Sequence, residues 1–194
     1  MLSVVGRCGT ASPYDGQHVR TLGNVVTALA NNGFYMQDPT GDSDTATSDG
    51  IFVYTGSAPT VSTGDIVNVD GDVVEYFEMT EFSGSLSITV VSSGNPLPAA
   101  VILDGGNPSG TQPQTGLELE RYESMLVSVP DGTTCAGTDG YGDVKITAAA
   151  SRAMREPGIE YPGLTGLPVW DGNPEIFEMN PEGLAGMANM DIPG

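Results

Sequence analysis

Positive charge is scarce in this sequence, which has six lysines and arginines against 25 aspartates and glutamates and a net charge of −19. Proteins that bind a phosphate backbone normally present a basic face, so this composition disfavours a general nucleic-acid binder. A solvated acidic surface would explain the charge, and so would carboxylates that hold hard cations such as Ca²⁺. Both explanations stay open at this point.

Histidine and cysteine are also rare. The sequence identifies no nucleophile or carboxylate partner for the single histidine, His18, so we expect a chain that is not an enzyme. The only cysteines, Cys8 and Cys135, do not have the spacing of a zinc motif. They predict either one disulfide, formed in an oxidising compartment, or two buried thiols.

Long hydrophobic runs are absent as well. No stretch of about 18 apolar residues occurs, which predicts that no helix spans a membrane. The first residues have no basic region followed by an apolar stretch, so we expect no signal peptide there. Glycine and proline, by contrast, are abundant at 27 and 14 residues, which favours a β-rich protein with many turns.

Runs of β-branched and aromatic residues between turn signals predict strands over the first hundred residues. The expected segments are His18–Ala30, Gly33–Pro39, Gly50–Gly56, Gly64–Phe82 and Ser85–Gly94. A glycine inside the first segment and Asp70-Gly71 inside the fourth indicate bulges or bends. Short strands at this close spacing predict a small barrel or sandwich.

The rest of the chain is less regular. One short helix is expected over Leu117–Ser124, with strands over Met125–Pro130 and Val144–Ser151. From Arg152 the sequence is broken by prolines and shows no period of a helix or a strand. We therefore expect a barrel domain over residues 1–151 and an extended tail over residues 152–194 that packs on the barrel or on a neighbour.

Two loops concentrate aspartates without lysine or arginine. Closely spaced carboxylates are the oxygen ligands that Ca²⁺ prefers, although an acidic loop of this kind is equally explained as a simple solvated turn. The spacing is not that of an EF-hand. The candidate ligands are Asp38, Asp42, Asp44 and Asp49 in the first loop and Asp131, Asp139 and Asp143 in the second.

Four stretches in order resemble one family: "GFYMQDPTGDSDTATSDGIFVYTG", "GDIVNVDGDVVEYFEMTEF", "ERYESMLVSV" and "REPGIEYPGLTGLPVWDGNPEIFEMNPEGL". They look like the OB-fold (YhcR-like) accessory region of large secreted bacterial nucleases of the endonuclease/exonuclease/phosphatase type. The resemblance covers most of the chain. It implies an all-β, OB-fold-like small barrel with one short helix and an extended C-terminal segment, and a non-catalytic module upstream of a catalytic domain.

The resemblance also implies partners and a location. The chain would be secreted, and would position single-stranded nucleic acid or neighbouring domains of the same polypeptide. Tyr35, Tyr54 and Tyr76 are the candidates for stacking on bases, although such rings can equally fill or cover the barrel. An alternative is a structural subunit of an extracellular filament, in which copies of the chain join through strand edges and the tail.

Overall fold

The computed structural model describes residues 11–77, 79–104, 120–140, 142–148, 176–179 and 192. These residues form strands and loops together with one turn of 3-10 helix, η1 (Glu120–Tyr122), which confirms the predicted all-β class. The chain divides into two compact units. The described residues of the first unit are 11–77, 79–101 and 120–126, and the remaining described residues belong to the second.

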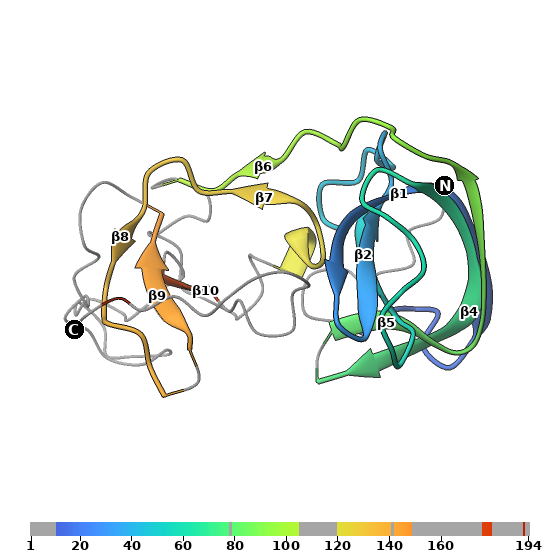
Figure 1. Cartoon of the computed structure of the whole chain (residues 1–194), viewed down its shortest axis with the longest axis horizontal. Helices are drawn as coiled ribbons and strands as arrows, with labels where there is room; N and C mark the ends of the chain where they lie inside the picture. The colour runs from blue at the N-terminus through green and yellow to red at the C-terminus, as the bar shows by residue number, and fades with distance from the viewer. Residues whose placement is uncertain are drawn as a thin grey trace, which may run out of the picture. The chain divides into compact units, whose positions relative to one another are not determined.

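Five strands of the first unit form a closed circuit of pairings, in the order β1-β2-β3-β5-β4 (Figure 1). All the pairs are antiparallel except β3 with β5, which is parallel. Each strand of this circuit has a partner on both sides, although β5 pairs with β3 at only two positions, Glu81 and Phe82. The joining of copies through strand edges stays a prediction. The strands are β1 (His18–Ala30), β2 (Gly33–Gln37), β3 (Gly50–Tyr54), β4 (Ile66–Tyr76) and β5 (Met79–Ser92).

The long strands bend where the sequence predicts it. In β1 the pairing with β4 shifts register between Thr21 and Asn24, and Gly23 between them has φ of 76°. In β4 the pairing with β5 shifts between Asp70 and Asp72, across Gly71. Such irregularities let a long strand curve from one part of a small barrel to the next.

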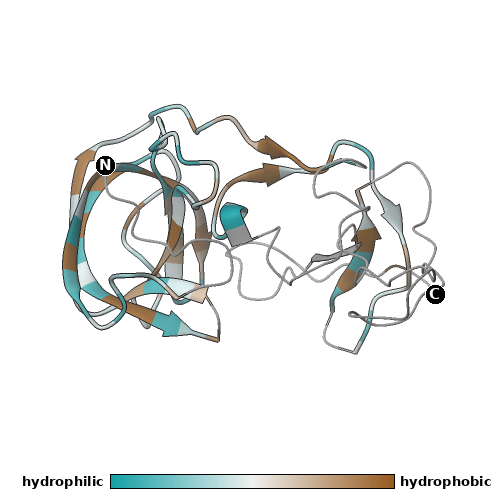
Figure 2. Ribbon diagram, turned by 180° about the vertical axis from the view of Figure 1, so that it is seen from behind, coloured by the Kyte–Doolittle hydropathy of each residue, from teal (hydrophilic) through white to brown (hydrophobic). Residues whose placement is uncertain are grey.

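The barrel interior is filled by the inward faces of these strands. In β4 the buried and half-buried residues alternate from Ile66 to Val73, and along the barrel strands hydrophobic and hydrophilic residues alternate (Figure 2). Burying each such side chain stabilises the fold by about 1.5–3 kcal/mol. The buried core cluster comprises Val26, Phe34, Met36, Ile51, Val53, Val61, Val67, Val69, Val73 and Phe82.

The boundary between β4 and β5 differs from the prediction. We expected one strand over Gly64–Phe82, but β4 ends at Tyr76 and β5 begins at Met79, which pairs directly with Tyr76. Phe77 turns the chain with a positive φ of 48°. No glycine, proline or asparagine marks the turn, which is why the sequence did not reveal it.

The chain beyond the barrel forms two small sheets. One pairs β6 (Val101–Ile102) with β7 (Val127–Ser128), and the other has the order β10-β9-β8. The strands of the second sheet are β8 (Thr133–Thr134), β9 (Val144–Thr147) and β10 (Ile176–Met179).

The division into units differs from the predicted boundary at residues 151 and 152. The second unit contains residues 127–148 as well as β10, because β9 pairs with β10 rather than with a barrel strand. The expected helix over Leu117–Ser124 is represented by η1; residues 117–119 lie outside the described part of the chain. Hydrophobic periodicity alone could not show that β9 takes its partner from the predicted tail.

Gly33 should not tolerate a side chain. A methyl group there would collide with the carbonyl oxygen of Val53 and the ring of Phe52. We expect Gly33→Ala to lower the free energy of unfolding by about 1–3 kcal/mol, read as a lower melting temperature. Gly140→Ala is the control, because its methyl group would enter open space. Equal melting of the two variants would contradict the pairing of β2 with β3 at this point.

Candidate functional site

The first acidic loop joins β2 to β3, and its two ends meet. Gln37 pairs with Gly50, and the next backbone N–H, that of Asp38, donates to the carbonyl oxygen of Asp49 at 2.9 Å. The hairpin therefore brings the first and last aspartates of the loop to its base. All four predicted calcium ligands of this loop therefore belong to one hairpin, as expected.

Within the loop, the carboxylates accept hydrogen bonds from backbone N–H groups of the same loop. Short polar side chains commonly stabilise turns in this way. The bonds run from Thr40 N to Asp38 Oδ1 at 2.9 Å, from Asp44 N to Asp42 Oδ1 at 2.7 Å, from Ala46 N to Asp44 Oδ1 at 3.0 Å and from Asp42 N to Asp49 Oδ1 at 3.0 Å. Much of the loop's order is therefore accounted for without an ion.

The carboxylates also repel one another. Burial raises the pKa of Asp49 above its usual range, the hydrogen bond from the Asp42 N–H lowers it, and the negative charges of Asp42 and Asp38 raise it again. A divalent cation would relieve this repulsion. Within the described ranges, however, no group of three or more acidic, histidine or cysteine side chains is arranged to hold a metal ion. Calcium binding by this loop stays a prediction.

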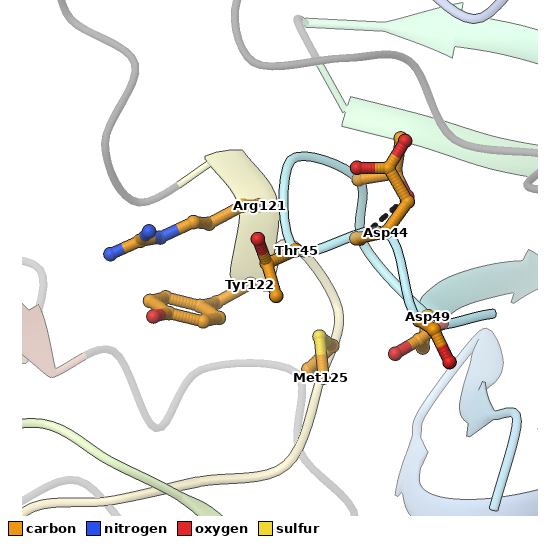
Figure 3. A pocket seen from close by; sticks show the side chains of 8 residues that line it. Asp44, Thr45, Asp49, Arg121, Tyr122 and Met125 are labelled. Atoms are coloured by element: carbon orange, nitrogen blue, oxygen red, sulfur yellow. Dashed lines mark hydrogen bonds between the residues drawn. The ribbon is translucent and has the colours of Figure 1, made fainter. Parts of the chain in front are cut away.

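A small cavity of about 170 Å³ lies between the loop and the turn that follows η1 (Figure 3). In Figure 3 the side chains of Arg121 and Tyr122 extend side by side, and the guanidinium lies 4.7 Å from the centre of the tyrosine ring. The cavity is open and holds charges of both signs. Its lining residues are Ser43, Asp44, Thr45, Thr47, Asp49, Arg121, Tyr122 and Met125.

The wall opposite the loop belongs to Glu120–Leu126, which we call the return segment because it belongs to the first unit although residues 102–119 do not. Glu123 is its main anchor. The backbone carbonyl of Glu123 accepts from Ser48 Oγ at 2.5 Å, and its side-chain Oε1 accepts from the N–H of Thr80 at 2.6 Å. Because the acceptor is a carboxylate, the bond from the Thr80 N–H is stronger than a hydrogen bond between neutral groups.

Two further contacts hold the return segment against β2 and β3. The N–H of Leu126 donates to the buried side-chain Oε1 of Gln37 at 3.0 Å. The backbone of Ser124 lies so close to Gly50 that a methyl group at Gly50 would collide with it. The segment thus meets the barrel at the ends of β2 and β3 and the start of β5.

These contacts fall on the outer face of the barrel. Phe34, Val53 and Phe82 point into the core, so their strand neighbours Tyr35, Phe52 and Glu81 point outward. Tyr35 pairs with Phe52, and Phe52 pairs with Glu81, which places the three in one row. Side chains on the outer face of a small barrel are usually exposed to solvent, but Phe52 and Glu81 are each only 5% exposed.

Of the three tyrosines predicted to stack on bases, Tyr35 is the most covered. Its ring centre is 4.8 Å from that of Phe52, and burial raises the pKa of its hydroxyl. Tyr54, at the end of β3, is 40% exposed, and Tyr76, at the end of β4, is 56% exposed. The three tyrosines therefore do not form one exposed aromatic surface on which bases could stack.

The second acidic loop lies in the second unit. There the N–H of Asp143 donates to Oδ1 of Asp139 at 3.1 Å, and the N–H of Asp139 donates to the carbonyl of Asp143 at 3.0 Å. The structure thus brings Asp139 and Asp143 together, while Asp131 is exposed near β8. Like the first loop, this one is organised by its own backbone.

Cys135 carries a free, half-buried thiol in the structure, and its predicted disulfide with Cys8 stays a prediction. Its Sγ lies 3.8 Å from the carbonyl oxygen of Thr133. Cys8, the expected partner, lies outside the described residues. The lone histidine, His18, is exposed and lies 2.7 Å from Asp72, and this hydrogen bond is the main cause that lowers the pKa of the Asp72 carboxyl.

Sequence reasoning missed the residues that hold the return segment, namely Gln37, Ser48 and Glu123. No local signal could have found them, because each acts through a contact with a distant part of the chain. Compared with protein-family models, curated proteins and solved structures, the chain matches none. Across the described ranges, no helix is long and apolar enough to cross a membrane.

Glu81 should make stability depend on pH. Burial raises its pKa, so its favourable contribution is present below the unfolded value near 4.5 and is lost as pH rises through the folded value. We expect Glu81→Gln to raise the melting temperature at pH 7, by roughly 4–8 °C for a gain of about 1 kcal/mol, and to change it little at pH 4. Glu75→Gln is the control and should not stabilise, because Glu75 accepts hydrogen bonds from Ser12 and Thr80. A pH-independent effect at Glu81 would contradict its burial as an acid.

Calcium should raise the melting temperature if the first loop binds it. A ligand that binds only the folded state at about 100 times its dissociation constant adds roughly 2.7 kcal/mol. The double variant Asp38→Asn/Asp49→Asn keeps side-chain oxygens for the turn but removes two charges, so it should abolish the shift. Mg²⁺ at the same ionic strength is the control. An unchanged melting temperature in millimolar Ca²⁺ would rule out a calcium site in this loop.

Proposed function

We propose that the barrel is an OB-fold and that the chain is a non-catalytic accessory module that binds and positions a neighbouring part of its own polypeptide. The pairing circuit β1-β2-β3-β5-β4 supports the fold assignment, because an OB-fold is a five-stranded barrel of this size. Among the described residues, His18 hydrogen-bonds to Asp72 and to no candidate nucleophile, which supports a non-catalytic role.

The site of ligand binding in OB-folds supports the positioning role. These barrels bind extended ligands across the face of their second and third strands. In this chain the return segment lies at that face, with hydrogen bonds to Gln37, Ser48 and Thr80. These three hydrogen bonds are the single observation that carries the proposal. The barrel then holds its own chain where a free OB-fold would hold a foreign strand.

Charge supports an intramolecular ligand over a nucleic acid. A net charge of −19 opposes a phosphate backbone, and the return segment offers backbone N–H and C=O groups in place of phosphates. Secretion, and attachment to a nuclease-like catalytic domain, remain parts of this proposal that rest on the family resemblance. Binding of single-stranded nucleic acid by Tyr35 is the weaker possibility, since its ring is packed against Phe52.

Hydrogen exchange and DNA binding together test the proposal. We expect the amides of Thr80 and Leu126 to be protected in the full chain, because both donate to side chains across the interface. Glu123→Gln replaces the charged acceptor of the Thr80 N–H, so it should speed exchange at both amides and cost about 1–2 kcal/mol of stability. Ser87→Ala, on the exposed part of β5, is the matched control.

A fluorescent single-stranded oligothymidine supplies the second measurement. Wild-type protein should give no anisotropy change at micromolar concentration and physiological salt. Tight binding that Tyr35→Ala abolishes would instead mean that the outer face is open to nucleic acid, and the proposal would be wrong. Unprotected amides at Thr80 and Leu126 would equally contradict it.

A further inference from the structure

The turn between β4 and β5 presents two aromatic rings to solvent. We call Tyr76 and Phe77 the aromatic turn. Phe77 is 88% exposed and Tyr76 is 56% exposed, and their ring centres lie 4.7 Å apart at an interplanar angle of 89°. This edge-to-face contact holds the pair together. Phe77 is the most exposed of the large hydrophobic residues in the described part of the chain.

The backbone conformation of the turn is energetically unfavourable for phenylalanine. Phe77 has φ of 48°, in the left-handed region, where a bulky side chain costs roughly 1–2 kcal/mol and glycine or asparagine is preferred. A phenylalanine here therefore lowers stability through its backbone, and its exposed ring gains too little burial energy on folding to offset that cost. Strain of this kind tends to occur at functional positions, where the side chain is needed for something other than folding.

The polar groups beside the aromatic turn are carboxylates. Glu75 precedes it, and its backbone N–H donates to Oδ1 of the exposed Asp15 at 3.2 Å. Oε1 of Glu75 accepts hydrogen bonds from Ser12 and Thr80, so Oε2 and the carboxylate of Asp15 are the oxygens that would meet a cation. Neither acid takes part in an ion pair within the described residues. The described cations of the first unit are engaged elsewhere: Arg20 lies 3.6 Å from Asp70, and Arg121 lies over the ring of Tyr122.

We infer that the aromatic turn is a docking site for an arginine-bearing basic segment of a partner protein. An aromatic face attracts a guanidinium through its quadrupole, and neighbouring carboxylates attract the same group through charge. The chain already contains this geometry once, in the contact of Arg121 with Tyr122. The net charge of −19 would steer a basic partner toward the protein and repel an acidic one.

This inference is independent of the OB-fold assignment and of the covered outer face. It needs only the exposed rings and the carboxylates beside them. A nucleic-acid strand would find aromatic rings here without any positive charge to neutralise its phosphates. A protein segment rich in arginine meets both features of the surface, so it is the occupant that the charges favour.

A pair of matched peptides tests it on the full chain. One peptide alternates arginine with glycine, and in the other citrulline, which is uncharged but similar in shape, replaces every arginine. We expect the arginine peptide to bind in isothermal titration, to weaken as ionic strength rises from about 0.01 M to 0.15 M, and to lose binding with citrulline. Equal binding of the two peptides would overturn the inference.

Substitutions locate the site. Phe77→Asn should weaken the arginine peptide about two- to fivefold, the value expected for losing one exposed cation–π contact, while the melting temperature stays the same or rises. Val91→Ala is the control, because Val91 is also an exposed apolar residue of this hairpin. Equal affinity of wild type and Phe77→Asn would place any peptide binding elsewhere. Tighter binding of a neutral oligosaccharide or of oligothymidine, or self-association lost in Phe77→Asn, would assign the turn to a different partner and overturn the inference.

Discussion

Every other feature of this protein follows from the closure of five strands around one small core. The interior has room for a single layer of valines, one isoleucine, one methionine and two phenylalanines, so the strands must curve tightly around it. The irregularities at Gly23 and across Gly71 permit that curvature. Once the circuit closes, the outer face of β2 and β3 and the turn between β4 and β5 are two surfaces at which the barrel can contact other segments or molecules.

These two surfaces have opposite characters. The outer face of β2 and β3 is satisfied from within the chain, since Glu123 and Leu126 bring hydrogen bonds to it and Phe52 is buried. The turn between β4 and β5 instead exposes Phe77 to solvent, in a strained backbone conformation. The barrel therefore binds the return segment at one surface and exposes the two rings of the aromatic turn at another.

Prediction from sequence succeeded where the signal was local and failed where it was not. The bounds of β1 follow from its β-branched residues and the Asn31-Asn32-Gly33 turn, and alternation in β4 shows which residues face the core. The turn at Phe77 was missed because a large aromatic residue stands where turns usually have glycine or asparagine. The unit boundary was missed because β9 pairs with a strand from far along the chain.

Local sequence signals were enough for the all-β class, for the positions of β1, β2 and β3 and for the placement of the first acidic loop at a hairpin. Each of these depends on neighbours within a few residues, through side-chain alternation and turn chemistry. Folding was needed to show that Glu81 and Phe52 are buried and that Glu123 anchors the return segment. The anchoring depends on contacts between segments some forty to ninety residues apart, as Thr80 with Glu123 and Gln37 with Leu126 show, and local patterns carry no information about such contacts.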